Sequence, residues 1–519
     1  MFQPSKYQTD IFQWIEKQEN RKTGQRHLVV AAGPGSGKTT TLVEAAKLIE
    51  NKQNAIFLAF NKHIATELQE RLPKGMTAST LHSLGLKAIM ANVGKFPKIE
   101  GKYHRNLAQD WVMENQDKLQ LTGEEWRDVV DEIVKLTKIC QLTMTDPRNK
   151  TAVKKQVHHY GVEVENFDTA IAAIPQILQR IVDNAGNMID FDDMVWLPAS
   201  QGWKPRQYSV IMADEVQDFN ACQRQLVKML LKPNGYAVWV GDRKQALYGF
   251  AYASVDSIDE IIEETKADEV PLSICYRCPK SHVKLAASIF SHEGYKLEAR
   301  HDAPEGVIKE IYDADIIDYV KPGDLILCRV NAPLVPLCFQ LIREGISAKV
   351  KGRDIGANLI TFIKKIEKNL NEGIDWDSPH ASLHTWQEEQ FKRLEKTIRD
   401  EDELAMKQAD LEDRIETILA IWSGKQPRTM AEMIRTIENL FSDDGASVWL
   451  STIHKAKGLE AEQVFIVKPS KMPHPMAKQN WAIRQEWNMK FVALTRAKQA
   501  LYFAWEADEP GCPLNLAAA

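Results

Sequence analysis

The chain has 519 residues, of which 44% are hydrophobic and 26% charged; these proportions are typical of a globular protein with a packed interior. At about 150 residues per domain, this length predicts three or four domains. No run of about 20 apolar residues could span a membrane, and the N-terminus lacks the apolar core of a secretory signal, so we expect a cytoplasmic protein with no membrane partner. The formal net charge is −5, which excludes nucleic-acid binding through an overall basic field and leaves only a local groove.

The N-terminal half alternates short apolar strands with helices. We predict a helix at 38–49, and strands at 28–32, 55–60, 208–215 and 236–242. Short, continuously apolar strands separated by helices are typical of a parallel sheet that is covered on both faces. Ligands of such sheets bind at the carboxyl ends of the strands.

A glycine-rich loop, GPGSGKTT, lies between the first predicted strand and the helix that follows. Gly33, Gly35 and Gly37 allow the backbone to turn tightly and to direct N–H groups at phosphate oxygens. We expect Lys38 to reach the β- and γ-phosphates of a nucleotide and the Thr39 hydroxyl to ligate Mg²⁺.

Two adjacent acids end the predicted strand at 208–215. Asp214 is predicted to hold Mg²⁺, directly or through water, and Glu215 to be the general base that orients and deprotonates the attacking water. The alternative is a solvated turn, which the pairing with the glycine loop disfavours.

Two features leave alternatives open. Cys275 and Cys278 have the spacing of metal ligands, but no second such pair exists, so buried thiols are favoured over a zinc site. The basic stretch 138–159 is either a solvated helix face or a contact for a nucleic-acid backbone.

The segment 84–190 is charged and is predicted to be mainly helical, which indicates an insertion. A second α/β region follows, with strands predicted at 325–330, 449–454 and 463–468. The segment 387–422 has no Gly or Pro, and its apolar residues fall mostly at helical spacings. It is predicted to be a long helix or a helical hairpin packed in an inserted subdomain; the alternative is an intermolecular coiled coil.

Five segments carry a specific resemblance to superfamily 1 helicases of the UvrD/Rep/PcrA type. They are DEVQD (214–218), GDRKQALYGF (241–250), CYRCP (275–279), STIHKAKGLE (451–460) and EWNMKFVALTRAK (486–498). The last two are especially similar to the motor of F-box DNA helicases, and the motifs occur in the family's order.

The resemblance implies an α/β fold of two RecA-like parallel-sheet motor lobes, each with a mainly helical inserted subdomain. We expect the first lobe at 1–83 and 191–270, with its helical insertion at 84–190. The second lobe is expected at 271–354 and 445–519, the latter including a tail, with a small helical insertion at 355–444.

The resemblance also implies the residues of an ATP site that is completed by Mg²⁺. Gln8 is expected to read the adenine edge, Tyr276 to stack on the ring, and Glu460 to bond the ribose. Thr40 and Gly458 are expected to line the nucleotide; relatives often have an arginine in place of Thr40, so adenine selectivity is expected to be looser. The catalytic set becomes Lys38 and Glu215, with Gln245 as the γ-phosphate sensor and Arg277 and Arg496 as arginine fingers.

The DNA contacts implied by the resemblance are of two kinds. Phe60, Tyr248 and Phe250 are candidates for base stacking, with core packing as the alternative for each. The strand's backbone is expected to contact Thr80, His82, Thr452 and His454. Relatives carry an arginine after the stacking aromatic, where this chain has Ala251.

The function implied is an ATP- and Mg²⁺-dependent DNA helicase that moves 3′ to 5′ along single-stranded DNA and separates duplex. Its partners are single-stranded and partly duplex DNA, which extends the expected location to a nucleus or nucleoid. One alternative is a translocase that displaces bound proteins and unwinds weakly; the other is a nucleotide-dependent DNA-binding scaffold. Motor residues specify no pathway and no protein partner.

Overall fold

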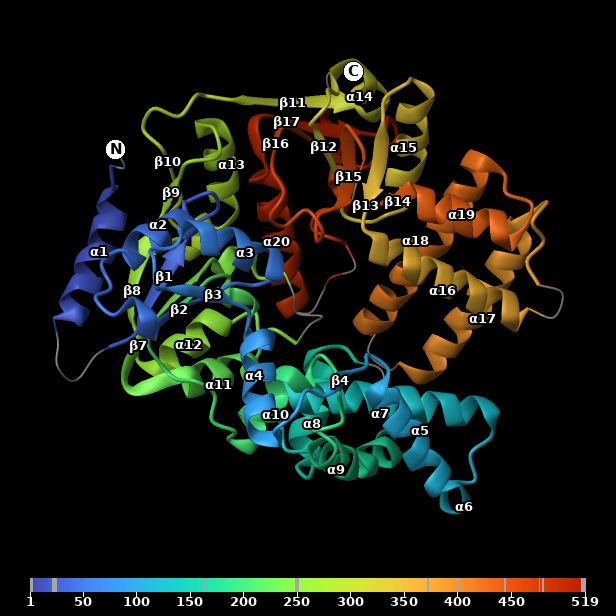
Figure 1. Ribbon diagram of the computed structural model, residues 1–519. Helices are drawn as coiled ribbons and strands as arrows, with labels where there is room; N and C mark the ends of the chain where they lie inside the picture. Colours follow the sequence, from blue (N-terminus) through green and yellow to red (C-terminus); the bar gives the residue numbers. More distant parts are fainter. Residues whose placement is uncertain are drawn as a thin grey trace. The chain divides into compact units, whose positions relative to one another are not determined.

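The computed structural model describes residues 3–20, 26–162, 164–247, 252–370, 373–398, 401–442, 445–475, 477 and 480–514. The chain forms two compact units, Met1–Ser273 and Ile274–Ala519. In Figure 1 the first unit runs from blue to yellow-green and the second from yellow-green to red. Each unit contains one large parallel sheet with helices around it.

The sheet of the first unit has six strands in the order β3-β2-β6-β7-β1-β8, and every pairing is parallel. The strands are β1 (Leu28–Ala32), β2 (Ala55–Leu58), β3 (Thr77–Ser79), β6 (Tyr208–Ala213), β7 (Leu231–Gly241) and β8 (Asp268–Leu272). The four predicted strands are confirmed, and they lie at the centre of the sheet. Both strands that the prediction missed are edge strands: β3 is only three residues long, and β8 contains two acids and a proline.

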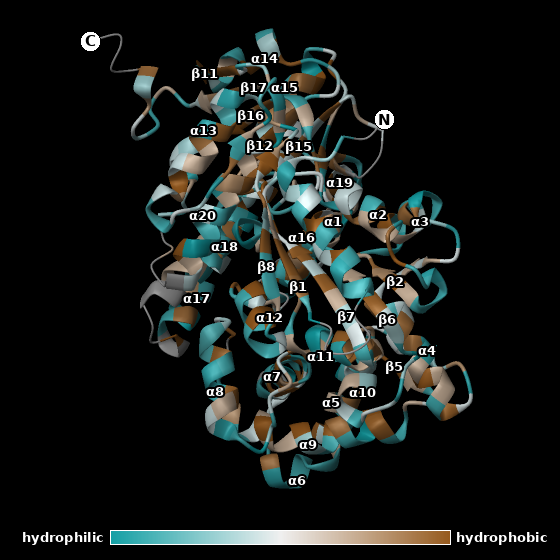
Figure 2. Ribbon diagram, turned by 90° about the vertical axis from the view of Figure 1, so that its left-hand side faces the viewer, coloured by the Kyte–Doolittle hydropathy of each residue, from teal (hydrophilic) through white to brown (hydrophobic). Residues whose placement is uncertain are grey.

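Helices cover both faces of this sheet because successive strand residues point to opposite sides. Leu28 and Val30 pack in a core with residues of α1 (Lys6–Glu19), α2 (Lys38–Ala46) and α3 (Lys62–Arg71). Val29 packs in a second core with residues of α4 (Leu81–Val93), α10 (Asp193–Gln201), α11 (Ala221–Leu230) and α12 (Ser257–Thr265). The apolar character of β1 is visible as brown ribbon in Figure 2.

A helical region extends the second core. It contains α5 (Tyr103–Glu114), α6 (Gln116–Leu119), α7 (Gly123–Leu142), α8 (Lys150–His159) and α9 (Phe167–Asp183), flanked by the short parallel pair β4 (Lys98–Ile99) and β5 (Met188–Ile189). Helix α7 packs against α5 and α9, and Ile133, Ile139, Ile174 and Ile177 are fully buried among them. The helical character predicted for this part of the chain is confirmed.

The second unit has a seven-stranded parallel sheet in the order β11-β17-β16-β12-β15-β13-β14. Its strands are β11 (Val307–Tyr312), β12 (Leu325–Cys328), β13 (Ala348–Lys351), β14 (Phe441–Ser442), β15 (Val448–Thr452), β16 (Ala461–Val467) and β17 (Ala497–Trp505). The three predicted strands form the adjacent set β16-β12-β15 in this sheet. A separate two-stranded pair joins β9 (Ile274–Cys275) to β10 (Glu298–Ala299).

The helices of the second unit are α13 (Lys280–Ile289), α14 (Ile316–Tyr319), α15 (Leu334–Arg343), α16 (Arg353–Asn369), α17 (Pro379–Thr397), α18 (Glu401–Lys425), α19 (Met430–Leu440) and α20 (Asn480–Leu494). The segment 387–422 lies in α17 and α18, which pack against each other as a helical hairpin. Ile415 and Ile418 of α18 are fully buried within this unit. Those apolar side chains therefore serve an intramolecular core, and the coiled-coil alternative is not needed to bury them.

None of the helices in the described ranges combines the length and the apolar composition that crossing a membrane requires.

Candidate nucleotide site and nucleic-acid surface

The glycine loop has the backbone of a phosphate cradle. Gly35 and Gly37 have φ values of 60° and 77°, a left-handed conformation that residues with a Cβ adopt only at a cost. Gly37 caps the N-terminus of α2, so the first N–H groups of the helix face the loop. The Ser36 hydroxyl is buried and has no hydrogen-bond partner among the described residues. A phosphate oxygen would satisfy these donors.

Gly33 differs from the other two glycines. Its N–H donates to the Leu272 carbonyl at 3.0 Å, which continues the pairing of β1 with β8 beyond Ala32. This N–H is engaged in the sheet, so Gly33 serves to position the loop in this structure.

Four residues predicted from separate motifs meet at the carboxyl edge of the sheet. Lys38 Nζ lies 3.0 Å from Glu215 Oε1. Thr39 Oγ1 lies 3.4 Å from Asp214 Oδ2. A hydroxyl and a carboxylate at one point are the oxygen donors that Mg²⁺ prefers, so the residues present fit that ion.

Burial and charge shift the pKa values of this cluster. Burial raises the pKa of Asp214, and the neighbouring Glu215 carboxylate raises it further, to about 6, against the attraction of Lys38. Burial tends to lower the pKa of Lys38, but the charges of Glu215, Asp214 and Asp242 outweigh it, and the net shift is upward. The site therefore holds a charged lysine among more acids than it can neutralise, which favours a cation beside Asp214.

The γ-phosphate sensor predicted from sequence lies next to this cluster. Gln245 ends the short 3₁₀ helix Arg243–Gln245, and its side chain is 5% exposed. Its Nε2 donates to Asp242 Oδ2 at 2.7 Å. Tyr248, Phe250 and Ala251 lie outside the described residues.

Gln8 joins α1 to α2. Its Oε1 accepts from the Ser5 N–H at 2.9 Å, and its Nε2 donates to Thr41 Oγ1 at 2.9 Å. The side chain is 3% exposed, so reading an adenine edge requires it to exchange one of these contacts. Thr40, on the same turn of α2 as Thr41, is exposed.

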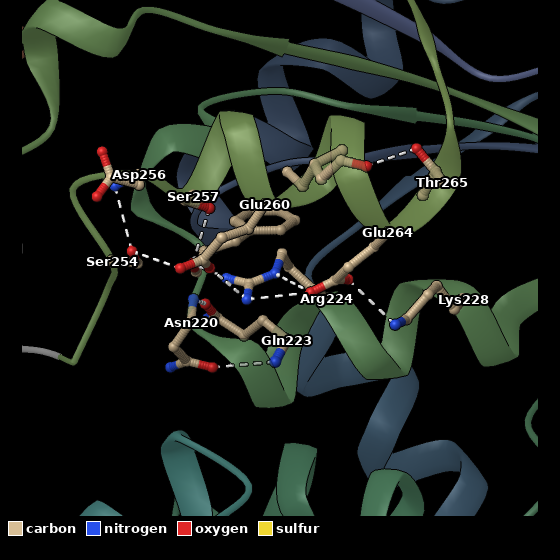
Figure 3. A network of polar contacts seen from close by, with 12 residues as sticks. Asn220, Gln223, Arg224, Lys228, Ser254, Asp256, Ser257, Glu260, Glu264 and Thr265 are labelled. Carbon is tan, nitrogen blue, oxygen red and sulfur yellow. Dashed lines mark hydrogen bonds and ion pairs between the residues drawn. The ribbon is translucent and has the colours of Figure 1, made fainter. Parts of the chain in front are cut away.

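A buried polar network fixes the turn that follows Glu215. The Ser257 hydroxyl lies 2.9 Å from the Val216 carbonyl and 3.0 Å from the Phe219 carbonyl, and Arg224 donates to the Phe219 carbonyl at 3.3 Å. Figure 3 shows Arg224 pointing into α12, where it meets Glu260 at 2.5 Å and Glu264 at 3.3 Å. Polar side chains at helical spacing give no sequence signal for such a network, because the partners come from different helices.

In the second unit, Arg277 and Glu460 are neighbours. Arg277 Nε lies 2.5 Å from Glu460 Oε2, and Lys498 Nζ lies 2.7 Å from Glu460 Oε1. Burial alone would raise the pKa of Glu460, but the two cations and their hydrogen bonds lower it overall. The predicted ribose ligand is therefore an ionised carboxylate that holds a predicted arginine finger. Tyr276 directly precedes Arg277 in the sequence. It is 39% exposed, and a ring that stacks on a base must be accessible in this way.

The other predicted arginine finger is folded into the second unit. Arg496 is 1% exposed, and it donates to the carbonyls of Val492 at 2.9 Å and Leu459 at 3.3 Å. Gly458 is exposed with a φ of 87°, and a Cβ added there would meet no atom of a described residue other than its chain neighbours within 4 Å. Its neighbour Leu459 thus connects the predicted nucleotide-lining turn to Arg496.

Cys275 and Cys278 are both buried thiols. The Cys278 N–H donates to Cys275 Sγ at 3.3 Å. Across the described parts of the chain, no group of three or more His, Cys, Asp or Glu side chains could hold a metal ion. The burial of both side chains agrees with the interpretation as buried thiols.

Predicted DNA contacts in the first unit come from the ends of two paired strands. β2 pairs with β3 through Leu58 and Ser79. Phe60 and Thr80 therefore lie just beyond the carboxyl ends of two neighbouring strands. Phe60 is 45% exposed, which disfavours core packing for it. Thr80 caps α4 by accepting from the Ser83 N–H at 3.2 Å.

An aromatic residue that sequence reasoning missed lies beside the predicted contact His82. The Phe191 ring is 6.4 Å from the His82 ring in an edge-to-face arrangement, and Phe191 is 59% exposed. A lone aromatic in the run DFDD gives no stacking signal in the sequence. Burial lowers the pKa of His82, against the opposing charge of Asp192.

In the second unit the predicted contact Thr452 is the last residue of β15, and His454 follows two residues later. Thr452 is 6% exposed. The pKa of His454 is lowered to about 3 by burial and by the charges of Arg329 and Lys455. A neutral imidazole contacts a phosphate by a hydrogen bond without adding charge. Arg329, which sequence reasoning missed, is held by Glu486, with Nη2 2.7 Å from Oε1.

The basic stretch 138–159 forms local contacts. Lys138 pairs with Asp192 at 3.1 Å and Lys150 with Asp168 at 2.8 Å. Lys154 lies over the Phe167 ring at 4.9 Å. These contacts favour the solvated helix face.

Comparison with known proteins agrees with this geometry. The model of the UvrD/REP helicase N-terminal domain matches residues 15–266, and that of the UvrD-like helicase C-terminal domain matches residues 447–504. The ATP-dependent DNA helicase Rep of Buchnera aphidicola subsp. Schizaphis graminum is 27% identical over 44% of this chain, and the match spans only 36% of that relative. Rep of Buchnera aphidicola subsp. Acyrthosiphon pisum is 20% identical over 92% of each chain.

The F-box DNA helicase protein 1 of Schizosaccharomyces pombe is 24% identical over 91% of this chain and 55% of its own length. The first family model includes the glycine loop and the paired acids Asp214 and Glu215, and the second includes Glu460 and Arg496. The chain belongs to the UvrD/Rep-type superfamily 1 helicase family.

Proposed function

We propose that this chain is an ATP-dependent DNA helicase. The observation that carries the proposal is the meeting of Lys38, Thr39, Asp214 and Glu215 at one edge of the sheet. These residues supply a cation for phosphate, donors for Mg²⁺ and a carboxylate for water. The relatives that share the family are named as DNA helicases, which supports DNA as the polymer.

In the proposed reaction, Lys38 leaves Glu215 to contact the transferred phosphate, and Glu215 then orients the attacking water and accepts its proton. Thr39 and Asp214 would hold Mg²⁺, whose charge would offset that of the phosphates. Gln245 would contact the γ-phosphate, and the segment that follows it would move when that phosphate is bound or lost. The roles of Arg277 and Arg496 as arginine fingers remain predictions from sequence.

The proposed DNA surface of the first unit consists of Phe60, Thr80, His82 and Phe191. Exposed rings stack on bases whatever their identity, which suits a motor that must step along any sequence. The family resemblance supports 3′ to 5′ movement, and action on DNA supports a location in the cytoplasm, the nucleoid or a nucleus.

The test is the steady-state rate of ATP hydrolysis with and without single-stranded DNA. We expect strong stimulation by DNA, and a loss of about 10²-fold or more in Lys38→Ala and in Glu215→Gln. Lys47→Ala is the matched control, because Lys47 lies at the other end of α2 and pairs with Glu44 at the surface. Normal cellular function of Lys38→Ala would favour the scaffold alternative instead.

Strand separation is measured next on duplexes with a 3′ or a 5′ overhang. Unwinding from the 3′ overhang alone is expected. Fast DNA-dependent hydrolysis with weak strand separation would favour the protein-displacing translocase, and unwinding from the 5′ overhang would refute the proposed polarity.

A further inference from the structure

Gln217 joins the ends of two adjacent strands of the first sheet. It lies in the 3₁₀ turn Val216–Asp218 after β6 and is 1% exposed. Its Nε2 donates to Glu215 Oε2 at 2.5 Å, and its Oε1 accepts from the Asp242 N–H at 3.0 Å. Asp242 follows β7, so this one side-chain amide links the predicted general base to the next strand along the sheet.

The link continues to the predicted γ-phosphate sensor. The Asp242 carboxylate accepts from Gln245 Nε2 at 2.7 Å through one oxygen and from the Lys244 N–H at 2.9 Å through the other. A continuous series of hydrogen bonds therefore runs from Glu215 through Gln217 and Asp242 to Gln245. All its members are largely buried, where such bonds are strong and their loss is costly.

The surrounding backbone is built to bring these groups together. A Cβ on Gly241 would lie 2.5 Å from Gln217 Oε1 and 3.1 Å from the Gln217 nitrogen, so glycine at 241 permits the close approach. Glu215 itself has a φ of 54°, a left-handed conformation that costs a residue with a side chain about 1 kcal/mol or more. Strain of this kind persists where neighbouring contacts hold it.

The two oxygens of Glu215 have different partners. Oε1 faces Lys38 and Oε2 faces Gln217. If Lys38 moves to a phosphate, the contact with Gln217 still fixes the direction of the carboxylate. Gln217 Oε1 accepts from the Asp242 N–H, so a shift of the segment 242–245 would change the orientation of the Glu215 carboxylate.

We propose that Gln217 is a positioning residue that orients Glu215 and makes its orientation depend on the segment 242–245. This inference rests on the proposed ATP-driven motor and adds a residue to it. A shift of the segment 242–245 when the proposed motor binds DNA then controls hydrolysis through Gln217. A merely structural Gln217 would satisfy buried groups without affecting the response to DNA.

The test is Gln217→Met, which keeps the length and volume of the side chain and removes its hydrogen bonds to Glu215 and Asp242, together with the longer one to Asp218 Oδ2 at 3.5 Å. Gln18→Met is the matched control: Gln18 is also 1% exposed and accepts from a backbone N–H, that of Arg26 at 3.0 Å, away from the nucleotide site. The kcat and KM for ATP are measured with and without single-stranded DNA, together with thermal unfolding.

We expect Gln217→Met to lower the DNA-stimulated kcat by about 10-fold to 100-fold, the scale of a misplaced catalytic group. The KM for ATP should stay within about twofold, because Lys38 and Thr39 still bind the nucleotide. The ratio of the rates with and without DNA should fall toward one, whereas Gln18→Met should keep the wild-type ratio.

If the Gln217→Met protein fails to fold, a second variant tests the same inference. Gln217→Glu keeps the acceptor for the Asp242 N–H and removes the donor to Glu215, so it should also lose DNA-stimulated kcat. A wild-type ratio in a folded Gln217 variant would overturn this inference alone. Hydrolysis by the wild type that ignores DNA would overturn the proposed function, and the inference with it.

Discussion

The network around Arg224 gives the sharpest prediction of stability. Arg224→Met keeps most of the side-chain volume and removes the guanidinium that pairs with Glu260 and Glu264 and bonds the Phe219 carbonyl. Two carboxylates on the same face of α12 then lose their shared cation. The change should destabilise the first unit and loosen the turn after Glu215.

The exposures of the partners set the magnitude. The Arg224 side chain is 7% exposed, but those of Glu260 and Glu264 are 37% and 32% exposed. Breaking a fully buried pair costs about 3–5 kcal/mol, and access of water to the two glutamates reduces this to about 2 kcal/mol. For a unit of this size, that loss lowers the melting temperature by about 4–8 °C.

The assay is thermal unfolding by calorimetry without nucleotide. Lys228→Met is the control, because Lys228 also pairs with Glu264, at 3.1 Å, but is 38% exposed; it should cost less than about 1 kcal/mol. Adding Glu260→Gln to Arg224→Met should recover part of the loss by removing one uncompensated charge. A melting temperature for Arg224→Met within about 2 °C of wild type would refute the reasoning.

Three further predictions concern the first unit. Burial alone would lower the pKa of His104, but the charge of Asp193 outweighs it and raises the pKa above its usual 6.5. The stability that the His104–Asp193 pair contributes is therefore full below pH 6.5 and is lost as the pH rises through the pKa of the folded state. In melting experiments, His104→Gln should therefore cost more stability at about pH 6 than at about pH 9. In Gly85→Ala the new Cβ would lie 1.8 Å from the Met194 carbonyl oxygen, so α4 and α10 must separate, and denaturant unfolding should show a loss of at least about 1–3 kcal/mol. Phe60→Ala should weaken single-stranded DNA binding by about 5-fold to 150-fold in fluorescence anisotropy, because a stacked base contributes about 1–3 kcal/mol.

Each of these three has a clear contrary result. Equal costs of His104→Gln at the two pH values would mean that the imidazole is neutral throughout. Unchanged stability of Gly85→Ala would mean that the helices separate freely. Unchanged DNA affinity of Phe60→Ala would remove its exposed ring from the proposed DNA surface.

The amino-acid sequence alone determined the central strands and the chemistry at their ends. The runs at β1, β2, β6 and β7 are short and apolar on both faces, and together with the helices between them they indicate a parallel sheet that is covered on both sides. The glycine loop, followed at once by Lys38 and Thr39, is also a local sequence signal. Parallel strands end at one edge, so Lys38 and Glu215 could be placed together before their distance was known.

The tertiary structure decided what depends on register and on contacts between distant segments. Edge strands such as β3 and β8 bury little, so their sequences carry a weak apolar signal. The pairing of Phe191 with His82 joins segments 109 positions apart in the chain. The contact of Gln217 with Asp242 exists because β6 and β7 are neighbours and Gly241 leaves room for the amide. Such contacts come from packing in three dimensions, which the spacing of residues along the chain does not encode.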